Sequence, residues 1–197
     1  MKYFWFFLFS ILTVTMQAQE NKPEKLPYHQ IPDAPETLDV NGVLARMIDG
    51  LGYRYYWATE GLVQDDLDYT PGNYGRKTHE VLNHLNGLSE VIKNAVTCRA
   101  NVRPRPDEEM TWEEQRRATL YNLQAASDFL RSGKGDPAKY AMVFQRGEQT
   151  SEFPLWNLLN GPLADAIYHV GQIVSYRRSA GNPMNPNVNV FLGITKE

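Results

Sequence analysis

Residues 163–176 read LADAIYHVGQIVSY and contain no Lys, Arg or Glu, so Asp165 carries the only formal charge in this stretch. At about 100° per residue, the aliphatic side chains fall on one helical face, and a separate polar stripe is left. That stripe holds Asp165, His169, Gln172 and Tyr176. A helix that is uncharged nearly all round is normally buried. A carboxylate within it must be paired, protonated or bound to a metal ion.

The other apolar residues predict three more helices, because they recur at steps of three and four residues. Thr111 and Glu114 form a capping-box pattern at the start of one helix, and Thr78 is a plausible N-cap of another. In the last helical segment, Pro162 can begin a new helix after a short preceding piece. The four predicted helices span residues 41–63, 78–95, 111–133 and 155–178.

Residues 134–154 show no helical period, and we interpret them as irregular. Within them, only Tyr140–Phe144 is typical of a short strand. The sequence therefore predicts an all-α fold: a four-helix bundle with an irregular segment between helices three and four. Such bundles build their sites from side chains on facing helices.

The N-terminus has the three-part layout of a secretory signal peptide over residues 1–18, with Lys2, an apolar run and a polar-small stretch ending at Ala18. The apolar run of 12 residues is shorter than the roughly 20 that span a bilayer. An uncleaved amphipathic anchor is the alternative interpretation. Residues 19–36, rich in Pro, Lys, Glu and Gln, predict an extended lead-in, and residues 37–197 form the predicted helical domain.

Composition excludes several classes of partner. The chain of 197 residues has 20 Lys and Arg against 23 Asp and Glu, so it lacks the basic surface that holds nucleic acid.

Its one cysteine, Cys98, leaves no internal disulfide and is too far from residue 18 for a lipid anchor; we expect it to be a small buried hydrophobe. We expect an exported protein, periplasmic or secreted, with no stable membrane insertion after signal cleavage.

The spacing of Asp165 and His169 favours a metal site. They are one helical turn apart, so both side chains can converge on one ion. His84 is the best third ligand, because it lies among apolar residues on the inward face of the second predicted helix, whereas His79 is about 140° away. Two imidazoles and one carboxylate with open positions suit Zn²⁺ or another first-row divalent ion. The predicted ligands are His84, Asp165 and His169.

Structural roles for the same residues stay open. Asp165 with His169 can form a hydrogen bond and nothing more, and His84 can be a hydrogen-bonded core residue. Glu80, one turn before His84, can accept a hydrogen bond from it. Gln172 and Tyr176 either face the same pocket or simply pack. Either Asp65 or Asp66 can reach the opening of the site and act as a base, and only their position in a loop suggests this role.

Two segments resemble the DinB-like (YfiT-like) superfamily of bacterial metal-binding four-helix bundles. They are residues 78–85, THEVLNHL, and residues 165–172, DAIYHVGQ, and the resemblance extends over roughly residues 44–181. It implies that His84 and His169 occupy ligand positions, while Asp165 stands where the family usually has histidine. The resemblance also implies a bound divalent ion: zinc, or nickel, manganese or iron.

Characterised members of that superfamily include enzymes in which the ion activates a low-molecular-weight thiol. The resemblance therefore implies a metal-dependent hydrolase or transferase that acts on a small molecule by activating water or a thiol. Export favours water, because it takes the protein away from the reducing thiol pool. The alternative is a non-catalytic helical bundle that binds a metal or a small ligand, or that assembles as a homodimer through an apolar helix face.

Overall fold

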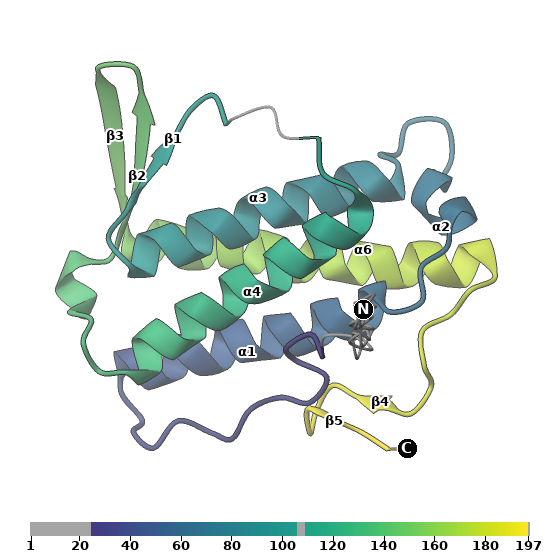
Figure 1. Ribbon diagram of the computed structural model, residues 1–197, viewed down its shortest axis with the longest axis horizontal. Helices are drawn as coiled ribbons and strands as arrows, with labels where there is room; N and C mark the ends of the chain where they lie inside the picture. Colours follow the sequence, from purple (N-terminus) through teal and green to yellow (C-terminus); the bar gives the residue numbers. More distant parts are fainter. Residues whose placement is uncertain (1–24, 106–108, 197) are drawn as a thin grey trace, which may run out of the picture.

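Four long helices pack side by side and enclose the core (Figure 1). The computed structural model describes residues 25–105 and 109–196, so the predicted signal peptide lies outside the described residues. Among the described residues, no helix is long and apolar enough to cross a membrane. The long helices are α1 (Val40–Thr59), α3 (Thr78–Val96), α4 (Trp112–Arg131) and α6 (Ala164–Ala180); the short ones are α2 (Gln64–Asp68), α5 (Leu155–Leu158), the 3₁₀ turn η1 (Pro137–Lys139) and the π-helical turn η2 (Leu159–Leu163).

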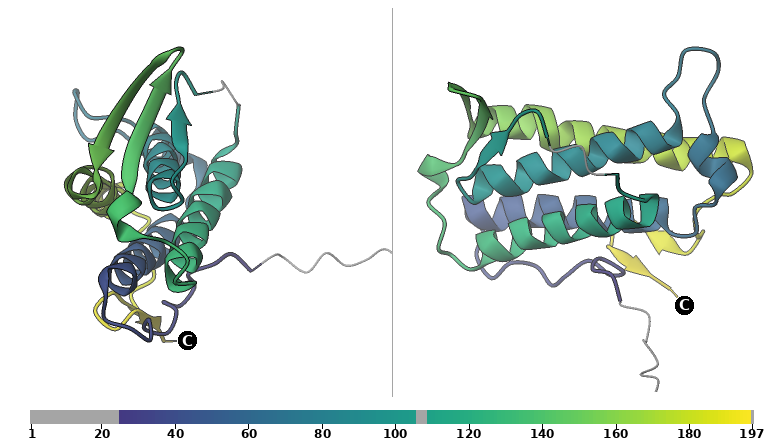
Figure 2. Two further views of the ribbon diagram at one scale, coloured as in Figure 1. Left: turned by 90° about the vertical axis from the view of Figure 1, so that its left-hand side faces the viewer. Right: turned by 45° about the horizontal axis from the view of Figure 1, so that its top comes forward.

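The prediction of an all-α four-helix bundle is wrong, because the chain also forms two sheets. Strand β1 (Ala100–Val102) pairs in parallel with β2 (Ala141–Arg146), and β2 pairs antiparallel with β3 (Gln149–Pro154). A second, two-stranded sheet joins β4 (Val188–Asn189) to β5 (Ile194–Thr195). The three-stranded sheet rises at one end of the helices (Figure 2). The fold is therefore α/β.

The segment that we expected to be irregular, residues 134–154, holds η1 and the β2–β3 hairpin. Gly147 makes the hairpin turn with a positive φ of 59°, which glycine adopts without strain. Every side chain of β3 is exposed, so the strand has no alternation of apolar and polar residues that a sequence pattern could detect. Its backbone hydrogen bonds to β2, and the pairing of β2 with β1, stabilise it instead.

The helix ends follow the sequence closely. Thr111 and Glu114 form the predicted capping box of α4, in which the Thr111 hydroxyl accepts the Glu114 N–H at 3.2 Å. Thr78 is the first residue of α3 rather than its cap, because Lys77 occupies the N-cap position and its N–H donates to Glu80 Oε2 at 2.8 Å. Glu80 therefore caps its own helix instead of orienting His84.

The last helical segment is continuous but bent. Its backbone passes from α5 through η2 into α6, and Gly161 has non-helical angles (φ −93°, ψ −105°) just before Pro162. The predicted break at this point is thus a kink, which a proline in the helical path readily causes. Downstream of the kink, α6 begins at Ala164 and places Asp165 in its first turn.

The described part of the lead-in is packed against α1 rather than free. Tyr28 is buried, and its hydroxyl donates to Asp49 Oδ1 at 3.2 Å. Gly52 makes room for it, because a Cβ there would lie 2.5 Å from the Tyr28 ring. Cys98 also differs from expectation: it is exposed with a φ of 53°, since it follows the C-terminal end of α3.

Candidate metal centre

The structure brings the three predicted ligands together between α3 and α6, which run in opposite directions (Figure 1). Nε2 of His84 lies 3.0 Å from Oδ2 of Asp165, and Nε2 of His169 lies 3.4 Å from Oδ1 of the same carboxylate. One ligand atom from each residue lies within 4.8 Å of the other two. In the described ranges, this is the one group of three His, Cys, Asp or Glu side chains that converges so closely.

The spacing of these atoms fits a first-row ion. Ligand atoms about 2.1 Å from a tetrahedral ion are roughly 3.4 Å from one another. The two nitrogen-to-oxygen distances are close to this value, and they reach the two different oxygens of the Asp165 carboxylate. The rings of His84 and His169 are nearly perpendicular, with centroids 4.7 Å apart. The same geometry also permits the structural interpretation, because Nε2 of His84 and Oδ2 of Asp165 form a hydrogen bond at 3.0 Å.

Gln172 holds the ring of His169. The Nδ1–H of His169 donates to Oε1 of Gln172 at 2.7 Å, and Nε2 of Gln172 donates to the Tyr168 hydroxyl at 3.2 Å. This network assigns the proton of His169 to Nδ1 and leaves the lone pair on Nε2 directed at Asp165. Metal-binding histidines are commonly fixed in this way. Gln172 is therefore a positioning residue of the cluster.

Replacing Gln172 by alanine should weaken zinc binding by about tenfold or more, because the ring of His169 loses the acceptor that sets its proton and its orientation. Competition against a chelator of known affinity measures the change. Ser175→Ala is the matched control, since the Ser175 hydroxyl donates to Gly171 O within α6 and lies outside the cavity. Equal zinc affinity in both variants would show that the Gln172 contact has no part in metal binding.

The cluster opens onto a cavity of about 480 Å³. The side chains of His84 and Asp165 are 36% and 40% exposed, whereas that of His169 is 11% exposed. One side of the cluster thus faces solvent and the other faces the protein. The cavity is lined by Tyr74, Gly75, Arg76, His84, Asp165, Tyr168, His169, Gln172 and Tyr176.

Tyr176, a residue of the polar stripe predicted from the sequence, also lines this cavity. Burial raises the pKa of its hydroxyl above the ordinary value, and Tyr168 and Tyr69 raise it further, while the charge of Arg76 opposes them. The hydroxyl is therefore protonated at neutral pH and can donate a hydrogen bond into the cavity. Gln172 and Tyr176 both face the pocket, as one of the two sequence interpretations expected.

The acidic residues considered as bases lie elsewhere. Asp66 is buried at the start of α2, where Oδ2 accepts the Val63 N–H at 2.9 Å and Asn182 Nδ2 at 2.6 Å. Asp65 is exposed, and neither residue lines the cavity. Sequence analysis missed Tyr74 and Arg76, which reach the cavity from the loop between α2 and α3. No periodic pattern marks residues in such a loop.

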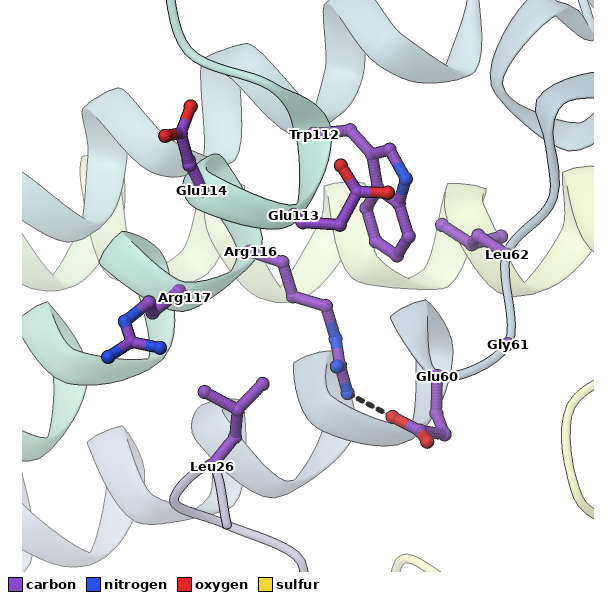
Figure 3. Close-up of a pocket in the computed structure, with 9 residues that line it drawn as sticks. All are labelled: Leu26, Glu60, Gly61, Leu62, Trp112, Glu113, Glu114, Arg116 and Arg117. Atoms are coloured by element: carbon purple, nitrogen blue, oxygen red, sulfur yellow. Dashed lines mark hydrogen bonds and ion pairs between the residues drawn. The ribbon is translucent and has the colours of Figure 1, made fainter. Parts of the chain in front are cut away.

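A second cavity of about 480 Å³ lies between the ends of α1 and α4 (Figure 3). Arg116 crosses it, pairs with Glu60 and donates to the Thr59 hydroxyl at 2.9 Å. Its guanidinium also lies 4.8 Å from the centre of the Tyr56 ring. The charged groups at its centre are thus engaged with one another, and this cavity offers no converging set of metal ligands among the described residues.

Comparison of the chain with protein-family models, curated proteins and solved structures finds no match. The resemblance of the α3 and α6 segments to the DinB-like superfamily therefore stays a prediction from those residues.

Proposed function

We propose that the protein is a divalent-metal-dependent hydrolase or transferase that acts on a small molecule, with His84, Asp165 and His169 as the metal ligands. The observation that supports it is the convergence of three ligand atoms from two helices in the lining of an open cavity. Three protein ligands and one open side are typical of catalytic zinc sites, whereas structural zinc sites are closed by four protein ligands. On the basis of the two ligand motifs, we also propose a relationship to the DinB-like superfamily.

The residues around the cluster suit this chemistry. A divalent ion bound there would lower the pKa of a coordinated water or thiol and so supply a nucleophile at neutral pH. Gln172 keeps the Nε2 lone pair of His169 available, and the neutral Tyr176 hydroxyl can donate to an oxygen on which charge develops. A cavity of about 480 Å³ lies within the range that accommodates small-molecule ligands.

Metal content, solvent access and turnover test the proposal together. We expect the purified protein to retain about one divalent ion per chain and, when loaded with Mn²⁺, to show an exchangeable water in proton-relaxation measurements. Panels of small esters, amides and phosphate esters, and of electrophiles offered with a thiol, should reveal turnover that a chelator removes and Zn²⁺ restores. His84→Ala should lose the ion and the turnover together.

A non-catalytic metal- or ligand-binding protein is the second candidate. It is favoured by the hydrogen bond between Nε2 of His84 and Oδ2 of Asp165, because two of the proposed ligands already satisfy each other. Under this alternative the bound ion has no exchangeable water, and metal loading raises the midpoint of thermal unfolding without any turnover. A metal-free protein whose stability does not respond to Zn²⁺ contradicts the first candidate and the metal-binding form of the second.

A further inference from the structure

We infer that the substrate of this site carries an anionic group, a carboxylate or a phosphate, which Arg76 binds at the mouth of the cavity. The inference rests on the proposed metal function and adds the substrate class to it. It follows from the charges that line the cavity, from the unpaired state of Arg76 and from the construction of the loop that carries this residue.

The cavity becomes positive once a divalent ion is present. Among the described residues that line it, Arg76 and Asp165 are the two with a formal charge, because its histidines are neutral when they act as ligands. A divalent ion outweighs the single carboxylate, and Arg76 adds to the excess. The whole chain, in contrast, has a net charge of −3. A local field of this sign concentrates anionic ligands in the cavity.

Arg76 also lacks a partner carboxylate within residues 25–105 and 109–196. Arg105 pairs with Glu90, Arg116 with Glu60 and Arg131 with Asp49, whereas no ion pair joins Arg76 to a carboxylate of the described residues. Its side chain is exposed at the cavity rim. A guanidinium presents parallel N–H donors that match a carboxylate or a phosphate, and here these donors are available to a ligand.

The loop between α2 and α3 is built to hold Arg76 in this place. Its ends are joined, because Tyr69 O accepts the Thr78 N–H at 3.0 Å. Its interior is tight, since a Cβ on Gly75 would lie 2.6 Å from the carbonyl oxygen of Pro71. At its base the ring of Tyr69 packs against Tyr176 on the cavity wall, with centroids 5.7 Å apart.

The loop can be seen above α2, where it leads into the first turn of α3 (Figure 1). Arg76 and Tyr176 both line the cavity, and the Arg76 charge opposes the larger effect of burial on the pKa of the Tyr176 hydroxyl. A ligand in the cavity would thus have both the Tyr176 hydroxyl and the Arg76 guanidinium in the lining around it.

Paired thiol probes on the cobalt-substituted protein test the inference. A thiolate bound to Co²⁺ gives a charge-transfer absorption, so titration yields the affinity of each probe without any knowledge of the substrate. The probes are 3-mercapto-1-propanol, which is neutral, 3-mercaptopropionate and 2-mercaptoethylphosphonate. We expect the anionic probes to bind about tenfold more tightly than the neutral one, as one charge-assisted contact to a ligand provides. The tighter of the two anionic probes identifies the anion.

Variants separate Arg76 from the general charge of the protein. Arg76→Gln should reduce the preference for the anionic probes to less than about twofold and leave the affinity for 3-mercapto-1-propanol unchanged, because only the contact to the anion is lost. Arg76→Lys should keep part of the preference. Arg178→Gln is the matched control: it removes an exposed arginine of α6 that lies outside the cavity, and it should keep the full preference.

The outcomes distinguish this inference from the proposed function. If Co²⁺ bands form but the neutral and anionic probes bind equally, or if Arg76→Gln keeps the preference, the inference about the substrate is overturned and the metal site stands. If no Co²⁺ bands form in the unaltered protein, the proposed function fails and the inference fails with it.

Discussion

His169→Ala should remove the bound metal ion, which is the largest functional effect that we expect from one substitution. His169 is the least exposed of the three proposed ligands, and Gln172 fixes its Nε2 lone pair toward Asp165. Structural zinc sites gain about 10–16 kcal/mol from four ligands, so the loss of one ligand lowers affinity by roughly a hundredfold or more. Elemental analysis after dialysis should show that the metal content falls from about one ion per chain to a small fraction of that value.

The control for this prediction is His79→Ala. His79 is exposed in the first turn of α3 and lies outside the cavity, so its removal changes the histidine content without touching the cluster. Thermal unfolding of both variants shows whether the fold is kept, since the imidazole of His169 is largely buried. Full metal retention by a folded His169→Ala protein would falsify the ligand set.

Asp49→Ala should give the largest loss of stability. Asp49 is completely buried in α1, where it accepts a hydrogen bond from Tyr28 and pairs with Arg131 of α4. Removal of the carboxylate leaves a partly buried guanidinium and a buried hydroxyl without their partner. Breaking a buried ion pair costs about 3–5 kcal/mol, and the partial exposure of Arg131 places the expected loss near the lower value. Urea unfolding at pH 7 measures the free energy.

Asp128→Asn is the matched control, because this carboxylate lies on α4 near the same network. Burial and the charge of Asp49 raise the pKa of Asp128 above its ordinary value, so its ionised form is disfavoured in the folded state. At neutral pH the substitution should therefore be neutral or slightly stabilising. This stabilising effect of Asp128→Asn should vanish below about pH 3.8, where the Asp128 carboxyl is protonated in both the folded and the unfolded state. A large loss in Asp128→Asn, equal to that of Asp49→Ala, would contradict this account of the network.

Local patterns were sufficient to predict the four long helices, but not the short helix α2. The apolar repeat places α3 and α4 within a few residues of their observed bounds, and the capping box at Thr111 and Glu114 marks the start of α4. These signals are readable because each depends on residues three or four apart in the chain. The β2–β3 hairpin has no such signal, since the side chains of β3 face solvent and its stability comes from backbone pairing.

For the candidate site, the sequence by itself determined that Asp165 and His169 share one face of a nearly uncharged helix, because a spacing of four residues is one helical turn. Tertiary structure decided everything that depends on distant segments meeting. It placed His84 against Asp165, directed Glu80 and Asp66 to helix caps, and closed a loop that brings Arg76 to the cavity. Helical periodicity determines the direction of a side chain from its own axis, but packing between helices determines what it meets.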